Sequence, residues 1–445
     1  MTIELQKSTQ FKINELVVVT KAGPIDISSI YEEINIFDSL FSPVISGSVL
    51  IRDSIGLSGR LIFDGSESLL IDIVKDDKSD IASYKRSFRI YKQANRTNEG
   101  MNSEMYVLNF VTDELMYSDQ QRINQAYENV YTQVVGRILE NYLRVPQKDL
   151  KGFFESSFGI KKIVIPNLRP LEAIEWCAKR AVDSRNSPNY LFYQNIAGFN
   201  FISLSSLLTK QDILDIKFEA KNLPGSDAFS EISTARSFEV VTQNDSIEKT
   251  RMGVNAGRFI GFDPMTRSIS SRPISYADHY TTMNHGNKNP NFSVIQNRGG
   301  QTNENTFDAR KTVSIFGTGR KFSNYIKRND PASLSKLDDT ENYVFQRKAI
   351  LSNLMSKRIK ITMPGNFQLS SGFNVRVEAP FFGIKEKGDE NKDESLTGKY
   401  IIIGSRHIIG YEKHETIIEV ATTSSENDVI PASNPNQTAQ VLSYA

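Results

Sequence analysis

The chain of 445 residues is poor in the residues that build covalent and metal chemistry, with one cysteine, one tryptophan and four histidines. The lone cysteine, Cys177, excludes a disulfide framework within the chain. Ile174, Ala178 and Ala181 surround it at helical spacing, which favours a small buried side chain over a reactive thiol.

Signals for membranes, secretion and nucleic acid are also missing. No window approaches the ~18 uninterrupted apolar residues of a membrane-spanning helix, and the N-terminus MTIELQKSTQ has no apolar signal core. The 53 Lys and Arg balance 52 Asp and Glu, so there is no bulk basic surface for nucleic acid. We expect a globular protein of about two to four domains, made and kept in a cytoplasm or in a particle assembled there.

Motifs of enzyme chemistry are absent as well. GLSGR lacks the second glycine of a nucleophile elbow at the needed position, and GTGRK lacks the rest of a phosphate loop. No two of the histidines, which are His279, His285, His407 and His414, have H-x-x-x-H spacing, and His407 within a strand favours a structural role. GDENKDESL resembles a calcium loop, but Glu394 stands where the turn needs glycine. We therefore expect no catalytic, cofactor-binding or metal site, and no enzyme.

The sequence does contain many segments with the residue pattern of β-strands. Between Phe11 and about Asp119, short β-branched and aromatic runs alternate with polar residues. The runs are ELVVVT, YEEINIF, SGSVLIRD, SLLIDIV, RSFRIYK and MYVLNFVT. Their spacing of roughly 8–12 residues predicts a β-barrel or sandwich over residues 1–120.

Residues 121–215 predict a small α+β domain. Apolar residues from Tyr127 to Tyr142 recur at i, i+3, i+4 and i+7, which indicates an amphipathic helix that ends before Pro146. A second helix is expected from about Arg169 to Val182, and NYLFYQNIAGFNFISL predicts a hairpin.

Strand patterns return over residues 216–280, expected to be the first part of a second barrel, and residues 341–424 are expected to form a helix and the closing strands of that barrel. Between them, residues 281–340 are polar and rich in Asn, Gly, Lys and Thr, which is typical of a docking insertion, with a solvated loop as the alternative. Residues 425–445 form a polar tail, expected to be an extended arm.

One internal similarity links the two strand regions. Ser46–Asp53 (SGSVLIRD) aligns without a gap with Ala256–Asp263 (AGRFIGFD), with a small residue and glycine at the start and aspartate at the end of both. Unless the match is a coincidence, it indicates two barrels of one design separated by the α+β domain.

Several long segments resemble baseplate hub proteins of contractile-tailed bacteriophages, a family related to the hub part of type VI secretion spike proteins. IYEEINIFDSLFSPVISGSVLIRDSIGL resembles the first barrel of that family, RPLEAIEWCAKRAVDSRNSPNYLFYQNIAGFNFISLSSL its second domain, and SFEVVTQNDSIEKTRMGVNAGRFIGFDPMTRS its second barrel. The resemblance implies a mainly β fold with an α+β insertion: two tail-tube-like antiparallel β-barrels and a small α+β domain.

The resemblance also implies a function. Three chains would form a homotrimeric, pseudo-sixfold ring in the tail baseplate of a virion, assembled in the host cytoplasm. Expected partners are a trimeric tail spike protein, the tube initiator and tube proteins, and the tape-measure protein, with DNA only in transit through the lumen. No cofactor and no membrane segment are expected. A viral receptor- or carbohydrate-binding β-protein is the alternative, and a tail-tip peptidoglycan hydrolase is a third possibility.

In such a ring, the stretch that begins at Pro43 would face an adjoining barrel. Proline cannot donate to a ladder, and Gly47, like Gly257 in the second segment, permits a bulge or a close approach of another backbone. We therefore place an inter-barrel contact at Pro43, Gly47, Ser48, Gly257 and Arg258, and expect Gly47→Val to weaken trimer assembly before it unfolds the monomer. An ordinary strand in the core of one barrel is the alternative.

Overall fold

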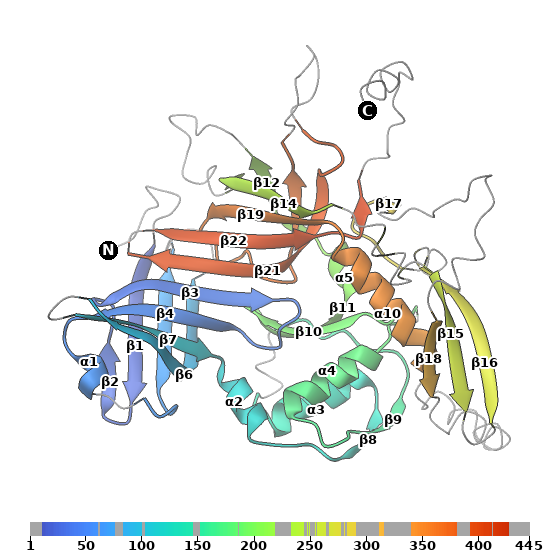
Figure 1. The fold of residues 1–445 in the computed structure, drawn as a ribbon, viewed down its shortest axis with the longest axis horizontal. Helices are drawn as coiled ribbons and strands as arrows, with labels where there is room; N and C mark the ends of the chain where they lie inside the picture. Colours follow the sequence, from blue (N-terminus) through green and yellow to red (C-terminus); the bar gives the residue numbers. More distant parts are fainter. Residues whose placement is uncertain are drawn as a thin grey trace, which may run out of the picture.

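The computed structural model describes residues 11–60, 63–75, 83–99, 103–145, 152–185, 187–218, 233–243, 247, 249, 254, 256–263, 267–276, 280, 283–290, 311–315, 340–380, 392–411 and 413–426. The predicted insertion at residues 281–340 and the predicted arm at residues 425–445 lie largely outside these ranges. Within them the protein is mainly β, with a small α+β region, as predicted (Figure 1).

The first β module covers residues 12–111. Its strands are β1 (Lys12–Thr20), β2 (Gly23–Asp26), β3 (Tyr31–Ser39), β4 (Ser46–Asp53), β5 (Ser68–Val74), β6 (Tyr84–Asn98) and β7 (Glu104–Val111), with a short helix α1 (Leu57–Arg60). β2 and β3 follow each other along one stretch of chain, whose start pairs with β1 and whose end pairs with β4. Pairing therefore runs from β1 through β2–β3, β4, β7, β6 and β5 back to β1.

Alternation of side chains builds the core of this module. In β5, SLLIDIV, every second residue is buried, because successive strand residues point to opposite faces. The buried face carries Leu69, Ile71 and Ile73, which join Phe88 and Phe110 in one core.

The α+β region follows. Its elements are α2 (Asp113–Asp119), β8 (Ala126–Asn129), α3 (Tyr131–Asn141), β9 (Lys161–Val164), α4 (Pro170–Arg180), β10 (Tyr190–Asn195), β11 (Gly198–Ser203) and α5 (Leu204–Thr209). Both predicted helices and the predicted β10–β11 hairpin are present. The first helix begins at Tyr131, however, and Tyr127, the start of the predicted apolar pattern, lies in strand β8. Cys177 is fully buried in the core of this region, and burial raises the pKa of its thiol to about 12, which confirms a small packed side chain.

The second β module is built from β12 (Asp212–Phe218), β13 (Thr234–Ala235), β14 (Ser237–Thr242), β19 (Arg358–Pro364), β20 (Asn374–Glu378), β21 (Gly398–Gly410) and β22 (His414–Ala421). β13 and β14 lie on one stretch of chain, whose start pairs with β12 and whose end pairs with β19. Pairing runs from β12 through β13–β14, β19, β22, β21 and β20 back to β12. A separate aliphatic core fills this module, including Ile359, Ile361, Val375, Val377 and Val420.

The two modules therefore share one strand order. When β2–β3 and β13–β14 are each counted as one strand, the third strand of each module (β4 or β19) pairs with the last (β7 or β22). The last strand also pairs with the one before it (β6 or β21). Both also carry a β-bulge at the same place in the final hairpin, between Ile90 and Lys92 of β6 and between Ile402 and Gly404 of β21. One strand differs, because β12 runs parallel to both neighbours whereas β1 runs antiparallel. The shared order and the shared bulge indicate a duplication.

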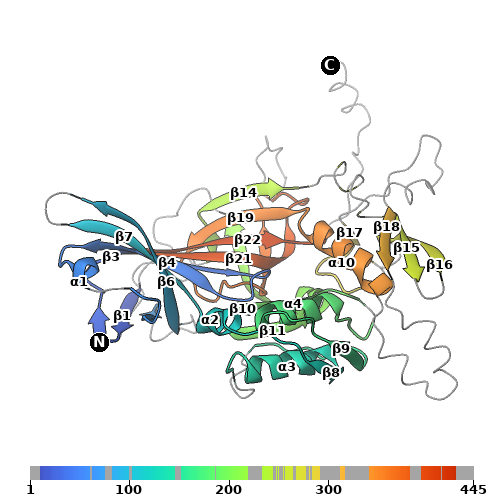
Figure 2. The same ribbon diagram turned by 60° about the horizontal axis from the view of Figure 1, so that its bottom comes forward.

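The strand that the internal similarity matched with β4 is not the structural counterpart of β4. Ala256–Asp263 forms β15, which pairs with β16 (Ser268–Ser275) and β18 (Lys311–Ile315) in a separate three-stranded sheet. Figures 1 and 2 show this sheet beyond helix α10 (Thr340–Leu354), apart from the large sheet. The counterpart of β4 is β19, so the match of Ser46–Asp53 with Ala256–Asp263 does not mark the duplication. A two-stranded pair of β17 (Asn289–Pro290) and β23 (Ser424–Ser425) completes the strands of the described residues.

Candidate assembly interface

Pro43 lies half-buried in the turn between β3 and β4, and this turn contacts the α+β region. The Ser42 hydroxyl donates to the carbonyl of Val44 at 2.8 Å, and the Ile45 amide donates to Oε1 of Gln194 at 3.1 Å. Val44 itself packs in the core of the α+β region. The turn therefore fixes the first module to that region.

Gly47 lies inside the first module. It faces Phe110 across β4 and β7, and a Cβ built on Gly47 would overlap the Phe110 ring and the carbonyl oxygen of Asn35. The phenyl ring thus occupies the space that any side chain at position 47 would need. Ser48 is half-buried and lies opposite Asn35 and Asn109 on the neighbouring strands.

Gly257 and Arg258 lie on β15, in the separate three-stranded sheet. Gly257 is buried, and the half-buried Arg258 donates to the hydroxyl of Ser271 on β16 at 3.5 Å. The structure therefore places Pro43 in a turn and the other four predicted interface residues in two different sheets. A contact of these residues with a neighbouring chain stays a prediction.

A different feature joins the two modules: β3 and β21 pair edge to edge. β21 pairs along one edge first with β20, through Gly398–Ile401, and then with β3, through Gly404–Gly410. Its other edge pairs with β22. Both modules consequently share one continuous sheet, and Figure 1 shows β3 beside β21 at its centre. We call this contact the internal joint.

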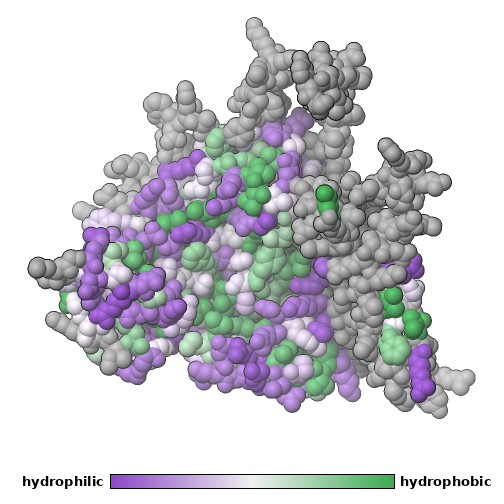
Figure 3. Space-filling view, viewed as in Figure 1, coloured by the Kyte–Doolittle hydropathy of each residue, from purple (hydrophilic) through white to green (hydrophobic). Residues whose placement is uncertain are grey.

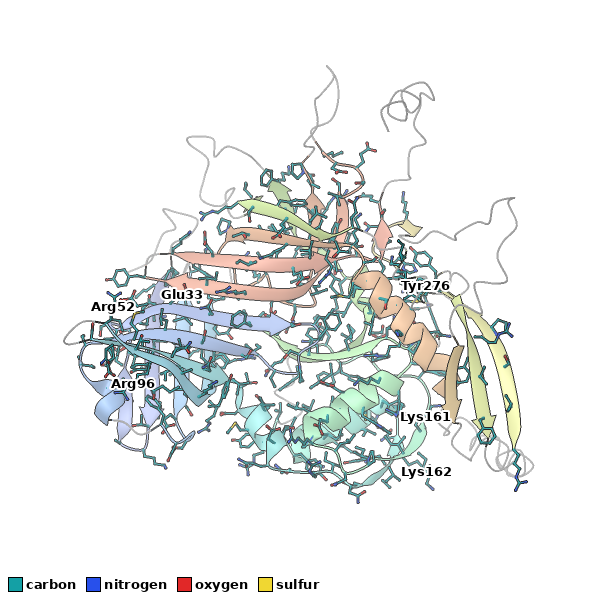
Figure 4. All side chains as sticks on the ribbon, in the orientation of Figure 1. Glu33, Arg52, Arg96, Lys161, Lys162 and Tyr276 are labelled. Atoms are coloured by element: carbon teal, nitrogen blue, oxygen red, sulfur yellow. The ribbon has the colours of Figure 1, made fainter. Side chains whose placement is uncertain are left out.

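Arg406 of β21 makes the polar contacts on the outer face of the internal joint. It lies opposite Phe37, with its guanidinium 5.5 Å from the centre of that phenyl ring. Its Nε donates to Oδ1 of Asn35 at 2.9 Å, and its Nη2 lies 3.9 Å from the carboxylate of Glu33, which Figure 4 labels on β3. Because both charged side chains are more than two-fifths exposed, water screens this ion pair and its contribution is small.

Asp38 secures the joint from the inside. It is 8% exposed and accepts hydrogen bonds from the Ser370 hydroxyl and, at 2.9 Å, from the Ser371 amide. Burial raises the pKa of this carboxyl group, and the two hydrogen bonds oppose that shift. Since both serines precede β20, Asp38 ties the loop between β19 and β20 to β3.

Three basic side chains are buried where the first module meets the β21–β22 hairpin: Lys75, His407 and His414. Nδ1 of His407 lies 3.1 Å from the hydroxyl of Thr416, which fits the structural role expected for this histidine. His414 packs on the backbone of Gly365, and its two ring nitrogens have no hydrogen-bond partner within the described residues. The ring of Phe367 lies 5.0 Å from that of His407 and 4.5 Å from that of His414.

Burial lowers the pKa of all three groups. It brings the pKa of Lys75 to about 7 and that of His407 to about 3, and it holds the pKa of His414 well below its usual value. The Lys75 ammonium, which donates to the carbonyl of Gly365, lowers both histidine pKa values further. Both imidazoles are therefore neutral at pH 7. Their protonation in acid disfavours the folded arrangement at the internal joint.

The internal joint was missed from the sequence, although one signal for it is present. KYIIIGSRHIIG belongs to a strand of 13 residues, whereas most strands have about 5–6. A strand of this length can serve two partners in succession along one edge, as β21 does.

Among the described residues, no helix is both long and apolar enough to cross a membrane, and no group of His, Cys, Asp and Glu side chains is placed to hold a metal ion. Figure 3 shows hydrophilic and hydrophobic residues interspersed over the face that carries the internal joint. That mixture is expected of strands whose outer face is half-exposed.

No family model and no curated protein matches the sequence. Solved structures do match. The tail protein from Neisseria meningitidis MC58 matches with a TM-score of 0.50 and 10% identity, over 93% of this chain and 96% of that chain. The 43 kDa tail protein of prophage MuSo2 from Shewanella oneidensis matches with a TM-score of 0.51 and 8% identity, over 92% of this chain and 98% of that chain. This protein therefore has the fold of phage tail proteins, in agreement with its resemblance to baseplate hub proteins.

Proposed function

We propose that the protein is the structural hub at the centre of a tail baseplate. Three copies place six β modules in a pseudo-sixfold ring, which joins a threefold tail spike to the sixfold tail tube. The ring belongs to the tail of a virion assembled in the host cytoplasm. Its partners are a trimeric spike protein and the tube initiator and tube proteins, and its channel passes the tape-measure protein and DNA. No catalytic step is part of this role.

The shared strand order of the two modules is the observation that supports this proposal most. A ring needs similar units that repeat one contact, and closed cyclic symmetry makes such contacts heterologous. This chain contains two units of that kind and one contact between them, the internal joint. The fold shared with two phage tail proteins supports the same setting.

Size-exclusion chromatography with light scattering, followed by negative-stain electron microscopy, tests the proposal. We expect a particle of three chains of 50.2 kDa each and rings with a central hole. Permanent interfaces of this kind bury roughly 2,000 Å² or more, so the trimer should persist on dilution. A chain that stays monomeric, alone and with a purified spike protein, would refute the hub. Glycan binding by that monomer would favour a receptor-binding protein instead.

A further inference from the structure

The internal joint shows how one module extends the sheet of the other. β21 uses Gly398–Ile401 for β20 of its own module and offers Gly404–Gly410 to β3. β6 is the counterpart of β21, and it carries a second bulge that β21 lacks, between Ala94 and Thr97, where Asn95 has a φ of 52°. Tyr84–Arg89 pair with β5, and beyond them this edge has no strand partner in the part of the chain that the structure describes. Tyr91–Asn98 therefore present an open edge.

β14 presents a second open edge. Its counterpart β3 pairs with β4 along one edge and with β21 along the other. β14 pairs with β19 along one edge, and its other edge has no strand partner among the described residues. Val240 and Val241 of this strand are exposed at 39% and 43%. The open edges of β6 and β14 are thus the counterparts of the two edges that meet at the internal joint.

Strand pairing fixes which residues of the two modules are equivalent. One row across the first module contains Arg89, Val111, Ser46 and Phe37. The equivalent row of the second module contains Ile401, Ala421, Arg358 and Thr242. With the bulge that both hairpins share, Arg406 corresponds to Ala94 and Phe37 to Thr242. Because Arg406 lies opposite Phe37 at the internal joint, the same contact between copies brings Ala94 opposite Thr242.

We propose that the open edge of β6 from Ala94 to Asn98 in one copy pairs antiparallel with the edge of β14 from Thr242 towards Ser237 in the next copy, with Ala94 opposite Thr242. This inference rests on the proposed ring and names the strands that close it. The occupant of each open edge is a second copy of this chain, because the two edges are complementary halves of a contact that the chain already makes within itself. Such a head-to-tail contact forms a ring when its rotation closes, and in the proposed hub it closes after three copies. Internal joints and joints between copies then alternate around the ring.

The side chains on the two open edges are suited to this pairing. Lys92 and Arg96 are exposed on β6, and Glu239 is exposed on β14. Within the chain Arg96 pairs with Glu104 at 2.9 Å and Glu239 lies 3.9 Å from Lys360, so the pairing of copies would add Arg96 and Glu239 to ion pairs that already exist. Figure 4 labels Arg96 on the first module, on the side away from the α+β region. Charges on an open edge also keep an unassembled strand from pairing at random.

A disulfide between copies tests the register. The full chain is prepared as Ala94→Cys/Thr242→Cys and oxidised mildly. Directly opposite residues of antiparallel strands have Cα atoms about 4.5–5.5 Å apart, which is within the range of a disulfide. The native Cys177 is buried and should not react. On non-reducing gels we expect covalent dimers and trimers that a reductant converts to monomers.

Two further variants make the test decisive. Ala94→Cys/Ile269→Cys keeps the β6 cysteine and moves the other to an exposed position on β16, so it should give no covalent trimer. Gln93→Cys/Gln243→Cys probes the next pair along the same register, in case the first pair disturbs folding. If light scattering finds a trimer but neither matched pair cross-links it, the inference fails and the hub stands. If the unmodified chain forms no trimer, either alone or with a purified spike protein, both the inference and the proposed hub fail.

Discussion

The corresponding hairpins of the two modules have opposite surfaces at their ends. In β21–β22, His407, Ile409 and His414 are 3% exposed or less, because the first module covers them. In β6–β7, residues 95–99 are exposed, and Arg96 pairs with Glu104 at 2.9 Å. One hairpin is covered within its own chain, whereas the other is exposed to water in the single chain. In the proposed ring, the two hairpins thus differ according to whether the partner belongs to the same chain or to a neighbouring copy.

The connections after β3 and β14 differ in a related way. The first module uses the short turn at residues 40–45, whereas the second has residues 243–357 at the equivalent place, including β15, β16, β18 and α10. Arg347 of α10 donates to the carbonyls of Ala178 and Tyr190, at 3.3 and 2.7 Å. The turn at residues 40–45 of the first module and helix α10 of the second connection therefore both contact the α+β region.

The largest effect is expected where the modules fill equivalent interior positions differently. Gly47 faces Phe110 in the first module, and Ile359 faces Val420 in the second. Gly47→Ala should lower the free energy of unfolding by about 3 kcal/mol, because its Cβ would overlap a buried ring and the backbone of Asn35. Urea unfolding measures this loss. The control Ile359→Val should cost about 1 kcal/mol. A Gly47→Ala chain that unfolds normally but does not assemble would support the interface role predicted for Gly47.

A smaller effect is expected at Asp38, whose equivalent in the second module is the neutral Gln243. Asp38→Ala should lower the free energy of unfolding by roughly 2 kcal/mol, since it leaves the buried Ser371 amide without its acceptor. Asp38→Asn keeps one acceptor oxygen and should cost less. Thermal unfolding of both variants measures the difference. Equal losses would mean that charge, rather than the hydrogen bond, holds the loop between β19 and β20.

Local features of this fold could be predicted from the sequence, and distant pairings could not. The period of α3 and α4, the end of α3 before Pro146 and the burial of Cys177 all depend on near neighbours in the chain. The duplication was inferred from the wrong strand, because β19 reads RIKITMP and lacks the glycine that makes β4 recognisable. The internal joint unites residues 33–39 with residues 404–410, and nothing in either segment alone specifies the other.

Acid should lower the free energy of unfolding through the two buried histidines of the β21–β22 hairpin. In the unfolded chain a histidine pKa is about 6.5, whereas the folded pKa of His407 is about 3 and that of His414 is also lowered. Between these values the unfolded state binds more protons, so stability falls as the pH falls. We expect a loss of about 1 kcal/mol per histidine between pH 6.5 and 5.5. The stability linked to Lys75 is lost as the pH falls from its unfolded pKa of about 10.5 to about 7, which lies above this window, so Lys75 adds little here.

Urea unfolding at the two pH values measures this effect. The double variant His407→Gln/His414→Phe should show a flatter dependence on pH. Asp38, the acid buried at the joint, has a raised pKa and acts in the opposite direction at low pH, but it is unchanged in both chains and cancels in the comparison. An unaltered slope in the variant would mean that the two buried histidines do not titrate with unfolding.

The smallest effect is expected at Arg406, and it bears on how alike the two kinds of joint are. Arg406→Ala gives the internal joint the residue found at the equivalent position of the open hairpin, Ala94. Its ion pair and its contact with Phe37 are exposed, so the free energy of unfolding should fall by only about 0.5–1 kcal/mol. A loss that small, in chemical unfolding, means that backbone pairing and the buried side hold the modules together, and Ala94 suffices at a joint between copies. A loss above about 2 kcal/mol would mean that the outer face is required. The β6 edge, which lacks that arginine, would then need another stabilising contact before it could close the ring.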